Sequence, residues 1–152
     1  RGVTNSELMF SFGADMVMLN TFNFDDDSKS LGLQGLSYQE LRALCRRPIG
    51  VYMGCPGTDA DVEDDLYDRG SMLATPEHVE RAVGMGADFI VLGGNPGSGT
   101  RIADVLATTA RVKGCYGDDV FAGGSSPENI HQLSISIKGM PYTYYRMASV
   151  NR

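Results

Sequence analysis

The sequence predicts an α/β fold built from parallel (β/α) repeats, and three observations support it. Apolar runs alternate with amphipathic segments along the chain, which is the pattern of a parallel α/β sheet. The apolar runs are closed by Gly, Pro or Asn, as is typical of strands buried on both faces. Finally, Gly13-Ala14-Asp15 and Gly86-Ala87-Asp88 each lead into an apolar run, about two βα units apart. This repetition favours a TIM-barrel-like parentage.

The first part of the chain is expected to contain two helices and two strands. Thr4 or Asn5 can cap the first helix, and Ser37 with Glu40 forms the capping-box pattern that starts the second. The predicted elements are a helix at 4–12, a strand at 15–21, a loop at 22–35, a helix at 37–45 and a strand at 49–53.

The second part begins with a long acidic loop at 54–73. Thr75-Pro76 then opens a helix, because Pro is favoured at the first helical position. We expect Gly114 to end the following helix, since Gly is common just past helix ends. The predicted elements are a helix from 75, a strand at 89–92, a helix from 100 or 101 to 113, a strand at 119–122 and a helix at 126–133.

The tail at 134–152 alternates apolar and polar residues before a cluster of tyrosines, which fits either a fifth strand or an irregular cover. The whole chain, 1–152, is predicted to be a single (β/α) domain. Four βα units are half of a barrel that typically takes about 250 residues. Two architectures are therefore possible. The domain is half of a barrel or an incomplete barrel, that is, a fragment whose strand edges need a partner, or else it is an open doubly wound sheet.

Composition narrows the function classes. The net charge of −6 argues against nucleic-acid binding, which needs clustered Lys and Arg. No apolar run approaches the roughly 20 residues of a membrane span. Three widely spaced cysteines, Cys45, Cys55 and Cys115, predict free thiols in a cytoplasmic protein rather than a disulfide framework.

The glycine-rich segment between the strand at 89–92 and the next helix is the sharpest motif. Glycines let backbone N–H groups approach an anion, and a helix start adds its positive dipole end. The predicted anion-binding residues are Asn95, Gly97, Ser98, Gly99 and Thr100. The spacing also resembles a nucleotide-binding P-loop, but Thr100 stands where the phosphate-binding Lys belongs. A purely structural glycine-rich turn is an equally open interpretation.

Other candidates follow the first two strands. Asn20 could orient a substrate carbonyl or a metal-bound water, and Cys55 is a weak candidate nucleophile because no base is predicted beside it. Asp59 and Asp61 are weak candidate ligands for Mg²⁺. The two histidines, His78 and His131, are expected to be surface or capping residues.

The stretches 3–8, 12–15, 19–22, 47–51, 74–76, 82–92, 94–99 and 117–120 together resemble a bacterial TIM-barrel family. Its members are labelled phosphoenolpyruvate phosphonomutase-like or haloacid-dehalogenase-like hydrolase. The resemblance covers about residues 3–124, and the second half of the barrel is absent after it. It implies that Asn20, Asn95 and the neighbouring glycines are site residues. This chain lacks the family's acidic residue after the second strand, where it reads Met53-Gly54-Cys55-Pro56, and the Lys and His after the fourth strand, where it reads 122–125 as Ala-Gly-Gly-Ser.

Three functions follow as hypotheses. The first is an enzyme-like barrel protein that binds a small phosphorylated or carboxylated metabolite at the strand ends; the resemblance implies a hydrolase or a lyase/mutase with Mg²⁺. The second is a non-catalytic half-barrel that pairs with another copy of itself as a homo-oligomer. The third is a degenerate P-loop-like nucleotide binder.

Overall fold

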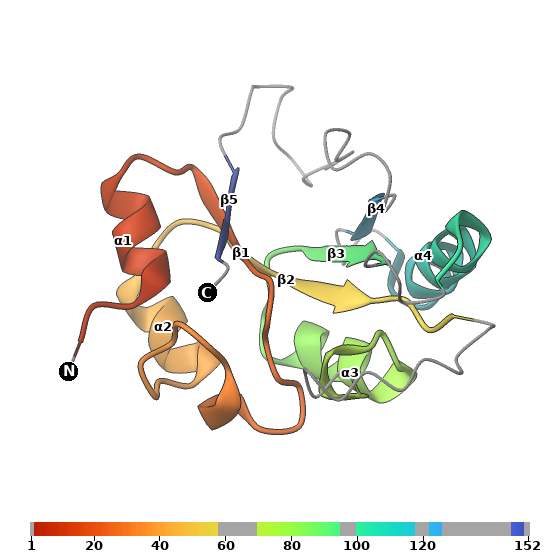
Figure 1. The fold of residues 1–152 in the computed structure, drawn as a ribbon, viewed down its shortest axis with the longest axis horizontal. Coiled ribbons are helices and arrows are strands. Elements are labelled where there is room, and N and C mark those ends of the chain that lie inside the picture. The colour runs from red at the N-terminus through yellow and green to blue at the C-terminus, as the bar shows by residue number, and fades with distance from the viewer. Residues whose placement is uncertain (1, 58–69, 95–99, 118–121, 126–146, 151–152) are drawn as a thin grey trace.

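Alternating helices and strands make up the parts of the chain that the structure, a computed structural model, describes: residues 2–57, 70–94, 100–117, 122–125 and 147–150. Figure 1 shows their arrangement. The elements are α1 (Asn5–Ser11), β1 (Met16–Leu19), the 3-10 turn η1 (Asp27–Lys29), α2 (Tyr38–Leu44), β2 (Ile49–Gly54), the 3-10 turn η2 (Gly70–Met72), α3 (Pro76–Gly84), β3 (Ile90–Gly93), α4 (Ile102–Tyr116), β4 (Ala122–Ser125) and β5 (Met147–Val150).

Capping side chains start α1, α2 and α3 where the sequence predicts. Thr4 and Ser37 each form a complete capping box with the glutamate three residues on. Thr75 accepts a hydrogen bond from the backbone N–H of His78, with Pro76 in the first turn of α3. Because each cap satisfies backbone N–H groups that have no partner within the helix, each stabilises its helix by about 1 kcal/mol.

The predicted end of α4 at Gly114 is wrong. The helix runs on to Tyr116, and Gly117, with φ +55°, follows it in the left-handed region. A glycine inside a helix costs only about 1 kcal/mol, and burial of Val112 in the core offsets that cost. The next strand lies at Ala122–Ser125, later than the predicted 119–122. The helix predicted at 126–133 lies outside the described residues.

The five strands form one parallel sheet in the order β4-β3-β2-β1-β5. Across the sheet, Leu19 pairs with Val51, Val51 with Ile90 and Ile90 with Ala122. All strands therefore point the same way, as predicted, and their carboxyl ends meet at one edge. The tail contributes β5, so residues 147–150 form a strand rather than an irregular cover.

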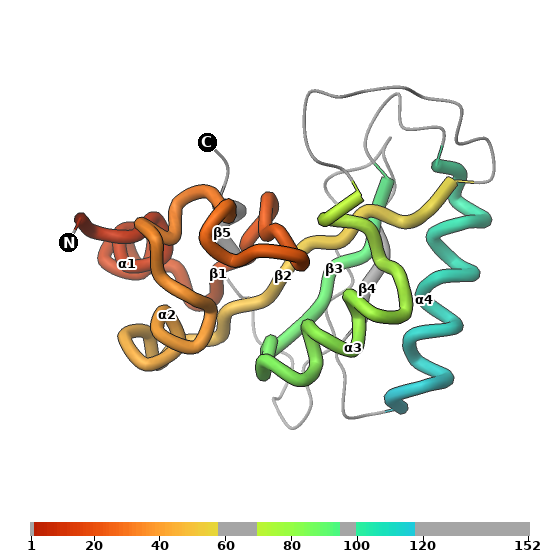
Figure 2. The backbone as a smooth tube through the Cα atoms, turned by 90° about the horizontal axis from the view of Figure 1, so that it is seen from below, coloured from red at the N-terminus to blue at the C-terminus, as the bar shows by residue number. Residues whose placement is uncertain are grey.

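The four helices of the described residues pack on one face of this sheet. Their inward side chains form a single core with every second residue of β1, β2 and β3, including Leu41 and Val79 from helices and Val17, Val51 and Leu92 from strands. Figure 1 shows α2 and α3 below the strands, and Figure 2, seen from below, shows them in front. Within the described part of the chain the sheet is open, with β4 and β5 at its edges. The doubly wound alternative is wrong for the described residues, because it would place helices on both faces.

The other face of the sheet, which we call the inner face, carries Met18, Tyr52 and Val91 between glycines. Met18 and Val91 are buried. Gly50 lies beside Phe89, and a Cβ at position 50 would collide with the Phe89 ring. The strands are thus buried on both faces, as their continuous apolar runs indicate.

The amino ends of the strands are fixed by side chains that bind backbone groups. The Tyr38 hydroxyl donates to the carbonyl of Ile49 at 2.6 Å, and the Asp88 carboxylate accepts from the N–H of Ile49 at 2.7 Å. Asp88 also pairs with Arg42 at 3.3 Å. Arg47 donates to the carbonyls of Phe10 and Ala14 at 2.9 and 2.7 Å. These bonds tie α1, α2 and the entry of β2 together.

Candidate functional site

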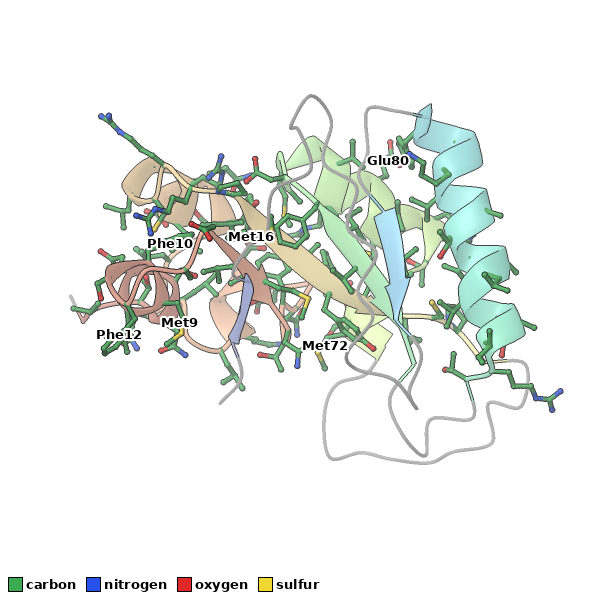
Figure 3. All side chains as sticks on the ribbon, turned by 90° about the horizontal axis from the view of Figure 1, so that it is seen from above. Met9, Phe10, Phe12, Met16, Met72 and Glu80 are labelled. Carbon is green, nitrogen blue, oxygen red and sulfur yellow. The ribbon has the colours of Figure 1, made fainter. Side chains whose placement is uncertain are left out.

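The carboxyl ends of β1, β2 and β3 meet at one edge, which we call the rim: residues 20–24, 54–55, 70–74, 94 and 100. Asn20 follows β1, Cys55 follows β2 and Gly94 follows β3, so the parallel sheet brings together three predicted positions that are far apart in sequence. Figure 3 shows Met72, from η2, near the arrowhead of β2. In parallel α/β folds this is the edge where ligands bind.

Thr100 holds the rim together. Its hydroxyl donates to the carbonyl of Cys55 at 2.9 Å, while the N–H of Cys55 donates to the carbonyl of Gly93 at 2.7 Å. Gly94 allows this packing, because a Cβ there would lie 2.7 Å from the Cβ of Thr100. With its proton donated to Cys55, the Thr100 hydroxyl does not donate to an anion in this arrangement. In the structure Thr100 links the chain just before α4 to the residue that follows β2.

Cys55 is buried in the structure and is a free thiol. Burial raises the pKa of the Cys55 thiol to about 11, against a smaller opposing effect of its hydrogen bond with Thr108. Because the thiolate is the nucleophilic form, a thiol with a raised pKa is poorly suited to covalent catalysis at neutral pH. The structure thus supports a packing role for this residue.

Asn20 is half-buried directly after β1, at the start of a segment that folds back over the rim. Within this segment the Asn23 side chain accepts from the N–H groups of Asp25 and Asp26 at 2.9 and 2.8 Å. Phe22 and Phe24 are buried, with ring centroids 5.0 Å apart. The segment therefore has an apolar anchor and an internal turn, and it places Asn20 at the rim.

His78 is a rim-proximal residue whose role the sequence interpretation missed. Its Nδ1 lies 2.8 Å from the carbonyl of Leu73 and its Nε2 lies 3.1 Å from the carboxylate of Asp25. The ring stacks on Phe24 with centroids 5.6 Å apart. One turn later, Arg81 pairs with Asp27 at 2.6 Å. Since both ring nitrogens have partners, His78 ties the segment after β1 to α3 rather than acting as a base in this state.

The sequence did contain a signal for this placement. Thr75-Pro76 starts a helix that follows β2, so the first turn of that helix must lie at the carboxyl edge of the sheet. A histidine in that turn is therefore brought to the rim. What could not be read from the sequence is its partner Asp25, which is 53 residues away.

Several predicted site residues lie outside the described residues: Asn95, Gly97, Ser98, Gly99, Asp59, Asp61 and His131. Among the residues that the structure does describe, no group of three His, Cys, Asp or Glu side chains could hold a metal ion. The Mg²⁺ prediction therefore stays a prediction. No helix in the described ranges has the length and apolar character needed to cross a bilayer.

Comparison with known proteins yields one match. No curated protein and no solved structure matches the chain. A family model described as a domain of unknown function, DUF7916, matches residues 1–124 and, in a second match, residues 115–152. These two matches together span the chain, including the parts that form β1 to β4 and β5. The chain belongs to the DUF7916 family.

Proposed function

We propose that this protein binds a small phosphorylated or carboxylated metabolite at the rim. The observation that supports this most is the convergence of three strand exits at one edge: Asn20 after β1, Cys55 after β2 and the glycine-rich segment after β3. Polar loops at the carboxyl edge of a parallel sheet are the usual ligand-binding position in such folds.

The wider fold proposal is a segment of a TIM-barrel-like protein. Its support is the run of neighbouring parallel strands β1 to β4 with helices on one face only, since a barrel places its helices on the outside. β5 beside β1 extends the sheet in the other direction. The resemblance to the phosphonomutase-like and hydrolase-like family adds a hydrolase or lyase/mutase reaction with Mg²⁺ as the proposed chemistry.

The charge distribution favours a small anion held by backbone groups. The net charge is −6, and near the rim His78 and Arg81 already contact Asp25 and Asp27. Backbone N–H groups of Asn95, Gly97, Ser98 and Gly99 would supply the positive potential, as glycine-rich turns before helices do. Asn20 would orient the rest of the ligand.

Thermal unfolding in the presence of ligands tests this proposal. Millimolar inorganic phosphate, glycerol 3-phosphate and succinate are compared, each with and without Mg²⁺. Binding to the folded state raises the melting temperature, because a ligand at about 100 times its Kd stabilises by about 2.7 kcal/mol. Gly97→Asp should abolish the shift by placing a carboxylate in the anion site. The matched control is Gly114→Asp, since Gly114 lies on α4 with open space around it.

Folded wild-type protein that shows no shift with any of these anions would refute the proposal. ATP belongs in the same panel because of the P-loop-like spacing. A shift with ATP alone, lost in Gly97→Asp, would favour the nucleotide-binding alternative.

A second candidate function is self-association, and exposed apolar side chains on α4 favour it. Ile102 and Leu106 are 55% and 65% exposed and lie one helical turn apart. In addition, β4 and β5 are the edges of the sheet that the described strands form, and strand edges can pair with another chain. Light scattering distinguishes the two functions: a dimer that Leu106→Glu converts to monomers supports association through α4, and a wild-type monomer excludes it.

A further inference from the structure

His78 contacts two separate parts of the chain through the two nitrogens of its ring. The residue lies in the first turn of α3, and its side chain is 13% exposed. Nδ1 lies 2.8 Å from the carbonyl oxygen of Leu73, and Nε2 lies 3.1 Å from Oδ1 of Asp25. Leu73 directly follows η2, whereas Asp25 belongs to the segment after β1. The ring therefore links that segment to the start of α3.

Both partners of the ring are hydrogen-bond acceptors. A carbonyl oxygen cannot donate, and neither can an ionised carboxylate. Asp25 is 66% exposed, so water stabilises its carboxylate form. A neutral imidazole carries a single N–H, so it can donate to Leu73 or to Asp25, and its other nitrogen then faces an oxygen lone pair. Only the imidazolium ring, with two N–H groups, donates to both oxygens. The two contacts together are those of a protonated His78.

Loss of one proton from the ring affects the two contacts differently. The contact with Leu73 is the shorter and is partly buried, whereas the contact with Asp25 is exposed. A partly buried carbonyl that loses its donor is costly, but a carboxylate that leaves the ring is solvated by water. The neutral ring therefore keeps the proton on Nδ1 for Leu73. Its bare Nε2 then faces the carboxylate, and this contact becomes repulsive.

The other charged groups around the ring come from three elements. They are Glu77 and Arg81 on α3, Asp27 on the segment after β1 and Arg111 on α4. Asp27 pairs with Arg81 at 2.6 Å, and the charge of Glu77 interacts with those of His78 and Arg111. A change in the charge of His78 therefore acts on Asp25 through direct contact and on Glu77 through space.

We propose that the contact between His78 and Asp25 is a pH-dependent latch, which holds the segment after β1 against α3. The latch is closed while both ring nitrogens carry protons. It opens as pH rises, because the ring keeps its proton for Leu73 and no longer donates to the carboxylate. The segment begins at Asn20, beside the other strand exits, so the latch sets how firmly this part of the rim is held. The inference goes beyond metabolite binding and does not depend on it.

NMR spectroscopy of the histidine ring tests the latch directly. Spectra are recorded at pH 5.5 and at pH 8, on either side of the range in which imidazole changes charge. Correlations between the ring protons and both nitrogens report which nitrogens are protonated. At pH 5.5 both nitrogens of His78 should carry protons, and nuclear Overhauser effects should join the ring to the Asp25 side chain. At pH 8 only Nδ1 should be protonated, and these effects should be lost. His131→Gln assigns the signals, since the chain has two histidines.

Asp25→Asn separates the charge of the contact from its geometry. The asparagine side chain can accept from an Nε2–H group or donate to a bare Nε2, so the contact should persist at both pH values. The melting temperature of the wild type should exceed that of Asp25→Asn by at most about 3 °C at pH 5.5, since exposed pairs contribute little. At pH 8 the difference should vanish or reverse. The matched control is Glu80→Gln, which removes an exposed carboxylate from α3 and should act equally at both pH values.

Three results would overturn the latch. The first is a His78 ring that carries a single proton at pH 5.5. The second is a neutral ring protonated on Nε2 at pH 8, because Leu73 would then not hold the remaining proton. The third is a difference in melting temperature between the wild type and Asp25→Asn that is the same at both pH values.

Discussion

The two ends of the sheet differ in the residues at which the strands begin and end. At the amino end, Tyr38, Arg47 and Asp88 bind backbone groups of other elements through bonds of 2.6 to 2.9 Å. At the rim, Thr100 and Arg111 also donate to backbone carbonyls, those of Cys55 and Ala74, but glycines occupy the strand exits at positions 54, 93 and 94. The amino end is fixed by side-chain bonds to the strands themselves, whereas at the rim the strands end in residues that have no side chain.

This difference teaches where stability and function lie in the fold. Side chains that bind buried backbone groups cannot also bind a ligand, so replacing one of them changes the free energy of unfolding. Glycine stabilises little, but it lets a ligand approach the backbone. Substitutions at the amino end should therefore change stability most, and substitutions at the rim should change it less.

Removal of Tyr38 should have the largest effect. The side chain is fully buried and its hydroxyl binds the carbonyl of Ile49. Tyr38→Ala leaves a cavity and an unpaired carbonyl, and it should lower the free energy of unfolding by about 3–5 kcal/mol. Tyr38→Phe keeps the ring and should cost about 1–2 kcal/mol. Urea denaturation followed by circular dichroism measures both; equal small losses would mean that this end is not the anchor.

Alkaline pH should destabilise the protein through Cys55. The pKa of its thiol rises from 9.0 to about 11 on folding. Between these values the unfolded chain releases a proton that the folded protein keeps, so the free energy of unfolding falls as pH rises from 9 to 11. Cys55→Ala should flatten this slope and Cys115→Ala, an exposed residue on α4, should not.

The same shift predicts slow alkylation. At pH 8 the thiolate fraction of Cys55 in the folded protein is about a hundredfold lower than in the unfolded chain. Mass spectrometry of iodoacetamide-treated protein, with and without urea, measures the two rates. Equal rates in both conditions would contradict the buried, packing role of Cys55.

Loss of the Thr100 hydroxyl should have a modest effect on stability. Thr100→Val keeps the volume but leaves the carbonyl of Cys55 without this donor, so the loss should be about 1 kcal/mol. Thr100→Ser keeps the hydroxyl and should lose less. If Thr100→Val and Thr100→Ser are equally stable, the Thr100–Cys55 hydrogen bond does not stabilise the rim.

The ion pairs beside the rim should contribute least. Asp25, 66% exposed, pairs with His78, whereas Asp27 is 18% exposed and pairs with Arg81. Exposed pairs contribute about 0–1 kcal/mol, so Asp25→Asn should be near neutral and Asp27→Asn should cost more. Thermal melts at low and high salt measure this, and a larger loss for Asp25→Asn would reverse the ranking.

Most of the elements could be predicted because their signals are local. The capping boxes at Thr4 and Ser37 and the Thr75-Pro76 start depend on residues three positions apart, and the structure confirms all three. The end of α4 could not be predicted, since the free-energy cost of Gly114 within a helix is small compared with the stabilisation that packing of the helix provides.

The candidate site was predictable in part for a related reason. Parallel strands must exit at the same edge, so the placement of Asn20, Cys55 and Gly94 followed from the fold class. Whether a side chain there is available to a ligand depends on contacts made from elsewhere. Thr100 binds the carbonyl of Cys55, which is 45 residues away, and so differs from its predicted role as an anion donor.

The sequence by itself determined the alternation of helices and strands, their starts and the shared direction of the strands. These properties depend on hydrophobic period and capping, which neighbouring residues encode. Only the tertiary structure decided that the helices share one face, that β5 lies beside β1 and that His78 meets Asp25. Each of these is a contact between residues distant along the chain, and such contacts are set by the packing of the whole sheet rather than by any local segment.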